Sequence, residues 1–194
     1  DEAYKATGSI IHMATGGGKT TTICRLIAKI QSAPFLYLVL SGDLLEQAYE
    51  ELSAQLNVPI GRIGFGYYDP QDITVMTVQT AIVAINENNK RFKLSDYKAD
   101  DETEWDEEDS KLAREKAENI RELIKSCVGV YFDEAHHISS KTSKEVMMTA
   151  SNAYWRFGGS ATPYREDGCE IMLQALLCKK IVEISMAWLI KKKY

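Results

Sequence analysis

The feature that most constrains this chain is a glycine-rich stretch, residues 13–20 (MATGGGKT), between an apolar run and a segment with helical periodicity. The apolar run before it predicts a strand, and the periodic segment after it predicts a helix. The three glycines allow the backbone to curl so that successive N–H groups point inward, and a helix start adds further unpaired N–H groups. The stretch therefore predicts a phosphate site in which Lys19 reaches the phosphates and the Thr20 hydroxyl ligates Mg²⁺.

One residue departs from the general phosphate-loop pattern, G-x-x-x-x-G-K-[ST]. That pattern has glycine six residues before the lysine, where this chain has Met13. A glycine-rich turn beside a lysine can also be a simple loop. The stretch alone does not decide between the two interpretations, so the rest of the chain has to.

Composition predicts one soluble globular domain, because 45% of the 194 residues are hydrophobic and 26% are charged. The longest apolar run, residues 33–40, is far too short to span a bilayer, and no leader opens the chain. We therefore expect no membrane partner and a cytoplasmic location, in the host cell for a phage protein, or a nuclear one in a eukaryote. The first residue is not Met, which favours a piece of a longer chain. The four cysteines show no C-x-x-C pair, which favours reduced thiols without a metal.

The net charge of −5 comes from one segment. Residues 100–109 carry eight acids and no base, so removing those eight charges leaves +3 for the rest of the chain. Overall acidity therefore does not exclude a nucleic-acid partner, and mild basicity elsewhere does not prove one. We interpret residues 88–110 as an acidic surface insertion, partly disordered.

Strands and helices alternate along the chain, which predicts an α/β fold with a mainly parallel sheet and helices on both faces. Strands are predicted at residues 10–13, 35–40, 60–66, 73–78, 128–132, 155–159 and 181–184, and helices at 21–30, 44–52, 79–85, 111–125, 142–154 and 170–177. Asp43 is expected to cap the helix over 44–52. Three polar segments each follow a strand: the glycine-rich stretch, residues 133–137 and residues 160–162. Because ligands of such sheets bind at the carboxyl ends of strands, these three segments should share one edge.

Asp133 and Glu134 follow the buried strand at 128–132. Asp133 is positioned to hold Mg²⁺, and Glu134, which strand alternation directs elsewhere, could act as the base for an attacking water. Alternatively, the two acids only favour the start of a helix. His136 and His137 could ligate zinc, but adjacent histidines on a turn rarely converge on one metal, so a hydrogen-bonding role is preferred.

At this point the motifs resemble those of a known family. Residues 13–20, Asp133-Glu134-Ala135-His136 and Ser160-Ala161-Thr162 look like motifs I, II and III of superfamily 2 helicases and translocases. Residues 40–48 and 74–80 look like motifs Ia and Ib. The first motif of that family commonly reads [AM]-x-T-G-x-G-K-T, which Met13 satisfies. The resemblance implies a RecA-like P-loop NTPase lobe that hydrolyses ATP.

The resemblance also implies a role for each matching residue. The ATP site would consist of Ala14, Thr15, Gly16, Gly17, Gly18, Lys19, Thr20 and Thr21, with Thr20 and Asp133 holding Mg²⁺ and Glu134 and Lys19 acting in catalysis. The residues that couple the γ-phosphate to lobe movement would be His136, Ser160 and Thr162. The residues that contact one nucleic-acid strand would be Ser41, Gly42, Thr77, Gln79 and Thr80. For Ser41 and Thr77, simple capping of turns and strand ends is the alternative.

His137 and residues 161–168 resemble the DNA-directed group, which includes type III restriction subunits, XPB-like repair helicases and phage branch-migration helicases. Contacts to the sugar–phosphate backbone carry no sequence information, so recognition should follow DNA structure. Three alternatives stay open: a translocating subunit of a restriction or remodelling complex that does not separate strands, a DEAH RNA helicase, and a non-motor P-loop protein.

Parts of the family pattern do not occur in these 194 residues. There is no second RecA-like lobe, and in this family ATP lies between two lobes. We therefore predict that residues 1–184 are the first lobe and that residues 185–194 begin a linker to the second. The fragment alone should hydrolyse ATP poorly.

Overall fold

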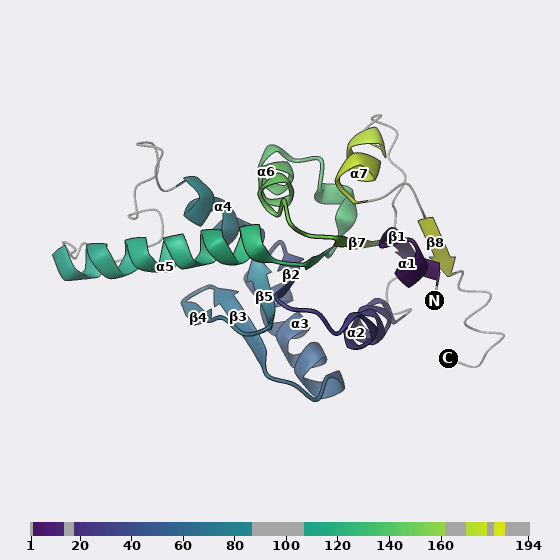
Figure 1. The fold of residues 1–194 in the computed structure, drawn as a ribbon, viewed down its shortest axis with the longest axis horizontal. Coiled ribbons are helices and arrows are strands. Elements are labelled where there is room, and N and C mark those ends of the chain that lie inside the picture. The colour runs from purple at the N-terminus through teal and green to yellow at the C-terminus, as the bar shows by residue number, and fades with distance from the viewer. Residues whose placement is uncertain (1, 14–17, 87–106, 162–169, 178–180, 185–194) are drawn as a thin grey trace.

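The computed structural model describes residues 2–13, 18–86, 107–161, 170–177 and 181–184 (Figure 1). The helices are α1 (Glu2–Lys5), α2 (Lys19–Ile30), α3 (Gly42–Gln55), α4 (Val78–Asn86), α5 (Glu107–Ser126), α6 (Lys141–Thr149) and α7 (Glu170–Leu176). The strands are β1 (Gly8–Met13), β2 (Phe35–Val39), β3 (Ile60–Gly64), β4 (Tyr67–Asp69), β5 (Ile73–Thr77), β6 (Gly129–Phe132), β7 (Trp155–Ser160) and β8 (Ile181–Ile184).

The eight strands form one sheet in the order β4-β3-β5-β2-β6-β7-β1-β8. Every neighbouring pair is parallel except β3 and β4, which are antiparallel. The predicted α/β fold with a mainly parallel sheet is confirmed. Because β6, β7 and β1 are neighbours, the segments that follow them lie at one edge of the sheet, as the sequence predicts.

Helices cover both faces of the sheet (Figure 1). The side chains of the central strand β2 are all buried and alternate between the two faces. Phe35, Tyr37 and Val39 belong to the core under α2 and α3, and Leu36 and Leu38 belong to the core under α4, α5 and α6. Burying one such side chain is worth roughly 1.5–3 kcal/mol, so the strands form a rigid base for the loops at their ends.

Several features of the fold differ from the prediction. Strand β4 is short and alternates exposed and half-buried residues, so it has no apolar run to predict it. The predicted helix over 142–154 is too long, because α6 ends at Thr149. The Arg156 guanidinium at the start of β7 donates to the carbonyl oxygens of Met147 and Ala150. This contact, across six to nine residues of the chain, stabilises the end of α6 and could not be seen in the sequence.

Helix α5 begins at Glu107, four residues before the helix predicted over 111–125 and within the segment interpreted as an acidic insertion, 88–110. Acidic residue types are favourable in the first turn of a helix, so the composition that indicated a loop is compatible with a helix start. Residues 87–106 lie outside the described part of the chain. Among the described helices, none is long and apolar enough to cross a membrane.

Candidate functional site

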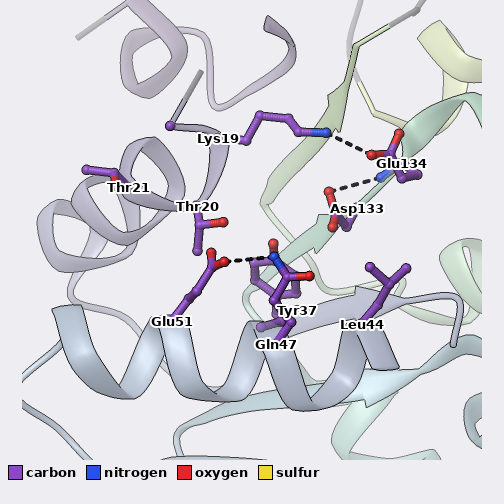
Figure 2. Close-up of a pocket in the computed structure, with 11 residues that line it drawn as sticks. Lys19, Thr20, Thr21, Tyr37, Leu44, Gln47, Glu51, Asp133 and Glu134 are labelled. Carbon is purple, nitrogen blue, oxygen red and sulfur yellow. Dashed lines mark hydrogen bonds and ion pairs between the residues drawn. The ribbon is translucent and has the colours of Figure 1, made fainter. Parts of the chain in front are cut away.

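A pocket of about 360 Å³ lies at the carboxyl edge of the sheet, between the start of α2, the end of β6 and one face of α3 (Figure 2). It is lined by Gly18, Lys19, Thr20, Thr21, Tyr37, Leu44, Gln47, Ala48, Glu51, Asp133 and Glu134. The structure thus brings together the lysine, the hydroxyl and the two carboxylates that the sequence predicted as one site.

The start of α2 forms one wall of the pocket. Gly18 precedes the helix in a left-handed conformation with φ of 89°, and it offers no side chain to cap the first turn. The first N–H groups of a helix have no partner within the helix, so they suit an anion. Thr21 is exposed at the rim. Ala14, Thr15, Gly16 and Gly17, which complete the predicted phosphate loop, lie outside the described residues.

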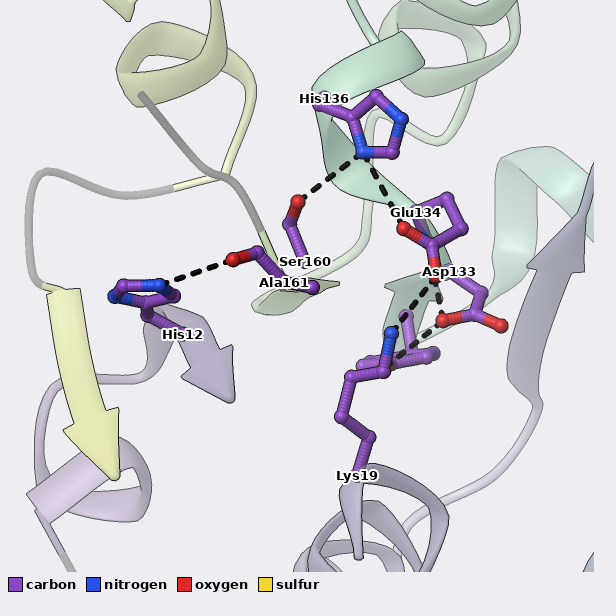
Figure 3. A network of polar contacts seen from close by, with 8 residues as sticks. His12, Lys19, Asp133, Glu134, His136, Ser160 and Ala161 are labelled. Atoms are coloured by element: carbon purple, nitrogen blue, oxygen red, sulfur yellow. Dashed lines mark hydrogen bonds and ion pairs between the residues drawn. The ribbon is translucent and has the colours of Figure 1, made fainter. Parts of the chain in front are cut away.

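The Lys19 side chain crosses the pocket toward the end of β6. Its Nζ lies 2.8 Å from Oε1 of Glu134, and the two side chains are 14% and 31% exposed (Figures 2 and 3). Water screens such a half-buried ion pair less than a surface pair. The lysine is therefore held where it could exchange its carboxylate partner for a phosphate.

Asp133 is fixed at the end of β6 by its backbone N–H, which donates to the Leu38 carbonyl at 2.9 Å. Burial raises the pKa of its carboxyl group, and nearby Lys19 only partly offsets this effect. A buried carboxylate of this kind is stabilised by a bound cation. The hydroxyl of Thr20 lines the same pocket, and hydroxyl and carboxylate oxygens are ligands that Mg²⁺ accepts. The donor set therefore fits the predicted metal.

Glu134 lines the same pocket as Asp133, although strand alternation predicts that the two side chains point in different directions. The residue lies beyond the end of β6 and has φ of 50°, a left-handed conformation that non-glycine residues seldom adopt. Such a conformation persists only where the surroundings enforce it, and it is frequent at functional sites. Here it turns the chain from the strand into a 3₁₀ turn, Ala135–His137.

A chain of polar contacts leads from Glu134 to the end of β7 (Figure 3). Nδ1 of His136 lies 3.3 Å from Oε2 of Glu134 and 3.1 Å from the hydroxyl of Ser160, which is fully buried. At the residue after Ser160, the carbonyl oxygen of Ala161 lies 3.1 Å from Nε2 of His12. Contacts thus connect α2, the turn after β6 and the end of β7. Thr162, the third predicted coupling residue, lies outside the described residues.

Two of the predicted nucleic-acid residues have structural roles in α3. The Ser41 hydroxyl accepts a hydrogen bond from the Leu44 N–H at 3.3 Å and caps the helix, which begins at Gly42. The prediction that Asp43 caps this helix is wrong. Asp43 lies in the first turn, where its negative charge interacts favourably with the positive end of the helix dipole.

The other three lie where β5, the strand next to β2, passes into α4. Thr77 ends β5, and Gln79 and Thr80 belong to the first turn of α4. The Thr77 hydroxyl accepts from the Thr80 N–H at 3.3 Å and lies 2.8 Å from the Thr80 hydroxyl. The exposed Gln79 side chain donates to the Leu40 carbonyl at 2.7 Å and so links the two segments. The structure thus brings all five residues together at the ends of the neighbouring strands β2 and β5, and none of them lines the pocket.

Sequence reasoning missed the pocket residues that come from β2 and α3. Tyr37 lies within the apolar run of β2, which gave no sign of a polar role. On α3, Leu44, Gln47, Ala48 and Glu51 recur at helical spacing and form one face. The polar residues Gln47 and Glu51 share this face with apolar residues, and that pattern could have indicated that α3 lines the pocket.

Comparisons with known proteins identify the family. Residues 3–165 match the family described as Type III restriction enzyme, res subunit. The chain is 36% identical over 85 residues to "Putative helicase 22" of Sulfolobus islandicus filamentous virus, an alignment that covers 44% of this chain and 15% of that protein. It is 26% identical over 183 residues to "DNA 3'-5' translocase XPB2" of Sulfurisphaera tokodaii, which covers 92% of this chain and 33% of that protein. The chain thus spans about a third or less of the length of these relatives.

Solved structures show the same fold. The helicase domain of Pyrococcus furiosus Hef superposes on this chain with a TM-score of 0.64 and 18% sequence identity. The superposition covers 95% of this chain and 36% of that one. The predicted RecA-like lobe is confirmed. Since the family match covers most of the residues and all five motif segments, this chain belongs to the family of the type III restriction enzyme res subunit.

Proposed function

We propose that this chain is the first motor lobe of an ATP-driven DNA helicase or translocase. The observation that carries the proposal is the pocket in which Lys19, Thr20, Asp133 and Glu134 converge from distant parts of the sequence. The names of the two relatives, a helicase and a DNA translocase, support a nucleic-acid motor. Since the chain spans only part of their length, the complete motor needs the second lobe, with residues 185–194 as the start of the linker.

Each of the pocket residues has a separate role in the proposed ATP hydrolysis. Lys19 and the first N–H groups of α2 bind the β- and γ-phosphates, together with residues 14–17 and Thr21. Thr20 and Asp133 hold Mg²⁺, which would neutralise phosphate charge when bound. When a phosphate replaces Glu134 as the partner of Lys19, the Glu134 carboxylate is released to accept a proton from the attacking water.

The contacts beyond Glu134 suggest how hydrolysis is coupled to movement. His136 contacts both Glu134 and Ser160, so a change in the position of Glu134 changes what the end of β7 contacts. We propose that Thr162, like His136 and Ser160, couples hydrolysis to movement of the lobes. Ser41, Gly42, Thr77, Gln79 and Thr80 would contact the DNA backbone at the neighbouring strand ends through backbone N–H groups, hydroxyls and the Gln79 amide. Such a motor works in the compartment that holds its DNA.

The complete natural protein provides the test. We expect DNA to stimulate its ATPase activity, and Glu134→Gln to lower the stimulated rate by roughly 100-fold or more while ATP still binds. The matched control is Glu122→Gln, which removes an exposed acid from α5 and should leave the rate unchanged. Failure of DNA and RNA alike to stimulate the enzyme would indicate a non-motor P-loop protein.

Two further measurements separate the remaining alternatives. A fork-unwinding assay beside a triplex-displacement assay distinguishes a helicase from a translocating subunit that leaves the strands paired. Stimulation by RNA but not by DNA would indicate a DEAH RNA helicase. Residues 1–194 alone should turn over ATP far more slowly than a two-lobe protein, and equal rates would contradict the requirement for a second lobe.

A further inference from the structure

Two tyrosines lie beneath the pocket, on neighbouring strands. Tyr37 of β2 and Tyr131 of β6 are direct partners in the parallel register, and their ring centroids are 4.6 Å apart. They are 2% and 0% exposed. A phenylalanine would fill the same space without a polar atom, and a buried tyrosine hydroxyl needs a hydrogen-bond partner. The partners of the two hydroxyls therefore matter.

The Tyr131 hydroxyl donates to Oδ1 of Asp133 at 3.4 Å. The two residues are two positions apart and thus on the same face of the chain. The Glu134 N–H donates to the same oxygen at 3.1 Å. Both of these donors use Oδ1, so Oδ2 is the oxygen of Asp133 that they leave to a cation.

A glycine on the next strand makes room for this hydroxyl. A Cβ atom on Gly159 of β7 would lie 1.9 Å from the Tyr131 hydroxyl oxygen, far inside van der Waals contact. Any side chain at that position would therefore displace the hydroxyl from Asp133. Gly159 immediately precedes Ser160, so the end of β7 also bears on the position of the Asp133 carboxylate.

Tyr37 lies beside the other predicted metal ligand. It lines the same pocket as Thr20 (Figure 2). A hydroxyl that binds a cation through its lone pairs has to donate its proton elsewhere, and the Tyr37 oxygen can accept it. Burial, together with the nearby Asp133 carboxylate, raises the pKa of both tyrosines, so both stay protonated at neutral pH.

We propose that Tyr37 and Tyr131 are positioning residues for the metal ligands of the ATP site: Tyr37 orients Thr20, Tyr131 orients Asp133, and the contact between their rings fixes the spacing of the two ligands. The proposal rests on the proposed function, since it assumes that Thr20 and Asp133 bind Mg²⁺. Groups that hold metal ligands from behind commonly change metal affinity by about 10- to 100-fold when removed.

The test uses Tyr37→Phe and Tyr131→Phe in the complete protein, and the readout is metal binding. Electron paramagnetic resonance follows Mn²⁺ binding in the presence of ADP, and a fluorescent ADP analogue in EDTA reports nucleotide binding without metal. We expect each variant to weaken Mn²⁺ binding by roughly 10-fold and to leave metal-free nucleotide affinity unchanged. Tyr68→Phe, on β4 away from the pocket, is the matched control and should bind Mn²⁺ like the natural protein.

The outcomes separate this proposal from the proposed function. If the two phenylalanine variants bind Mn²⁺ normally while Asp133→Asn does not, the tyrosines are only core residues and the proposal is overturned. If Asp133→Asn also binds Mn²⁺ normally, the metal site itself is wrong. Protein labelled with 3-fluorotyrosine provides a second measurement that does not depend on the folding of a variant. Mg²⁺ added with ADP should shift the fluorine resonances of Tyr37 and Tyr131 but not that of Tyr68, and unshifted resonances would contradict the proposal.

Discussion

Two groups of motif residues lie at the same edge of the sheet, and they are held in different ways. In the pocket and directly beside it, side chains contact partners from distant segments. Lys19 of the pocket contacts Glu134, 115 residues away, and beside the pocket His136 contacts Ser160, 24 residues away. At the ends of β2 and β5, Ser41 and Thr77 accept hydrogen bonds from N–H groups three residues further along.

This difference shows how far each motif informs function. A helix cap explains why a serine or threonine is present, without any ligand. No comparable local need explains a lysine and a glutamate that meet in a half-buried pocket. The pocket residues should therefore affect activity more than stability, and the capping residues should do the reverse.

Lys19→Ala should have the largest effect and tests the pocket side of this comparison. Without the ammonium group, the phosphates lose their cation, and ATP hydrolysis by the complete protein should fall by about 100-fold or more. Steady-state ATPase assays with DNA measure it. Lys29→Ala, in the last turn of the same helix, is the control and should retain activity. A Lys19→Ala protein with normal turnover would overturn the assignment of the pocket.

Asp133→Asn should lower ATP hydrolysis by roughly 100-fold, because the proposed Mg²⁺ loses a charged ligand, yet it should stabilise the metal-free protein. The raised pKa of Asp133 means that the folded state binds this proton more tightly than the unfolded state. The protonated Asp133 therefore stabilises the fold at pH values below the pKa of the unfolded state. This stabilisation is lost as the pH rises through the pKa of the folded state.

Denaturant unfolding in EDTA, from pH 4 to pH 7.5, measures the stability of both proteins. At neutral pH the asparagine protein should have the higher free energy of unfolding, and its stability should change less across that range. A lower stability of Asp133→Asn at neutral pH would show that Asp133 contributes to the fold as an ion, as the capping residues contribute through hydrogen bonds.

The sequence was sufficient for those parts of the fold that depend on local patterns. The apolar run that became β2 and the acids directly after β6 predicted a parallel sheet with a polar edge. The periodicity of α2 likewise placed Lys19 and Thr20 at a helix start. These features depend on periodicity and on residue order, which the sequence shows directly.

Other parts depend on contacts that the sequence does not show. The left-handed conformation of Glu134 brings both carboxylates to one pocket, against the alternation of a strand. Arg156 ends α6 through carbonyl groups that lie six to nine residues earlier in the chain. The sequence indicated only a core role for Tyr37, because it comes to line one pocket with Thr20 only after β2 and α2 have packed.

Ser41→Ala tests the other side of the comparison. Loss of the helix cap should lower the free energy of unfolding by about 1 kcal/mol, with little change in DNA-independent ATP hydrolysis. Ser151→Ala, at an exposed position after α6, is the control in denaturant unfolding. If Ser41→Ala keeps full stability but binds DNA more weakly, the residue serves the ligand and not the helix, and the comparison fails at this position.

Gln79 should give the smallest effect, because its side chain is exposed and, within the described part of the chain, makes one hydrogen bond, to the Leu40 carbonyl. Gln79→Ala should change stability by no more than about 0.5 kcal/mol, and if the DNA backbone also binds here, DNA affinity should fall about 3-fold. Gln79→Glu places a negative charge beside the proposed phosphates, so it should weaken binding further, and more so at low salt. Fluorescence anisotropy of labelled DNA at several salt concentrations measures both variants. Equal DNA affinity of Gln79→Glu and the natural protein would show that the DNA track does not pass the junction of β2 and α4.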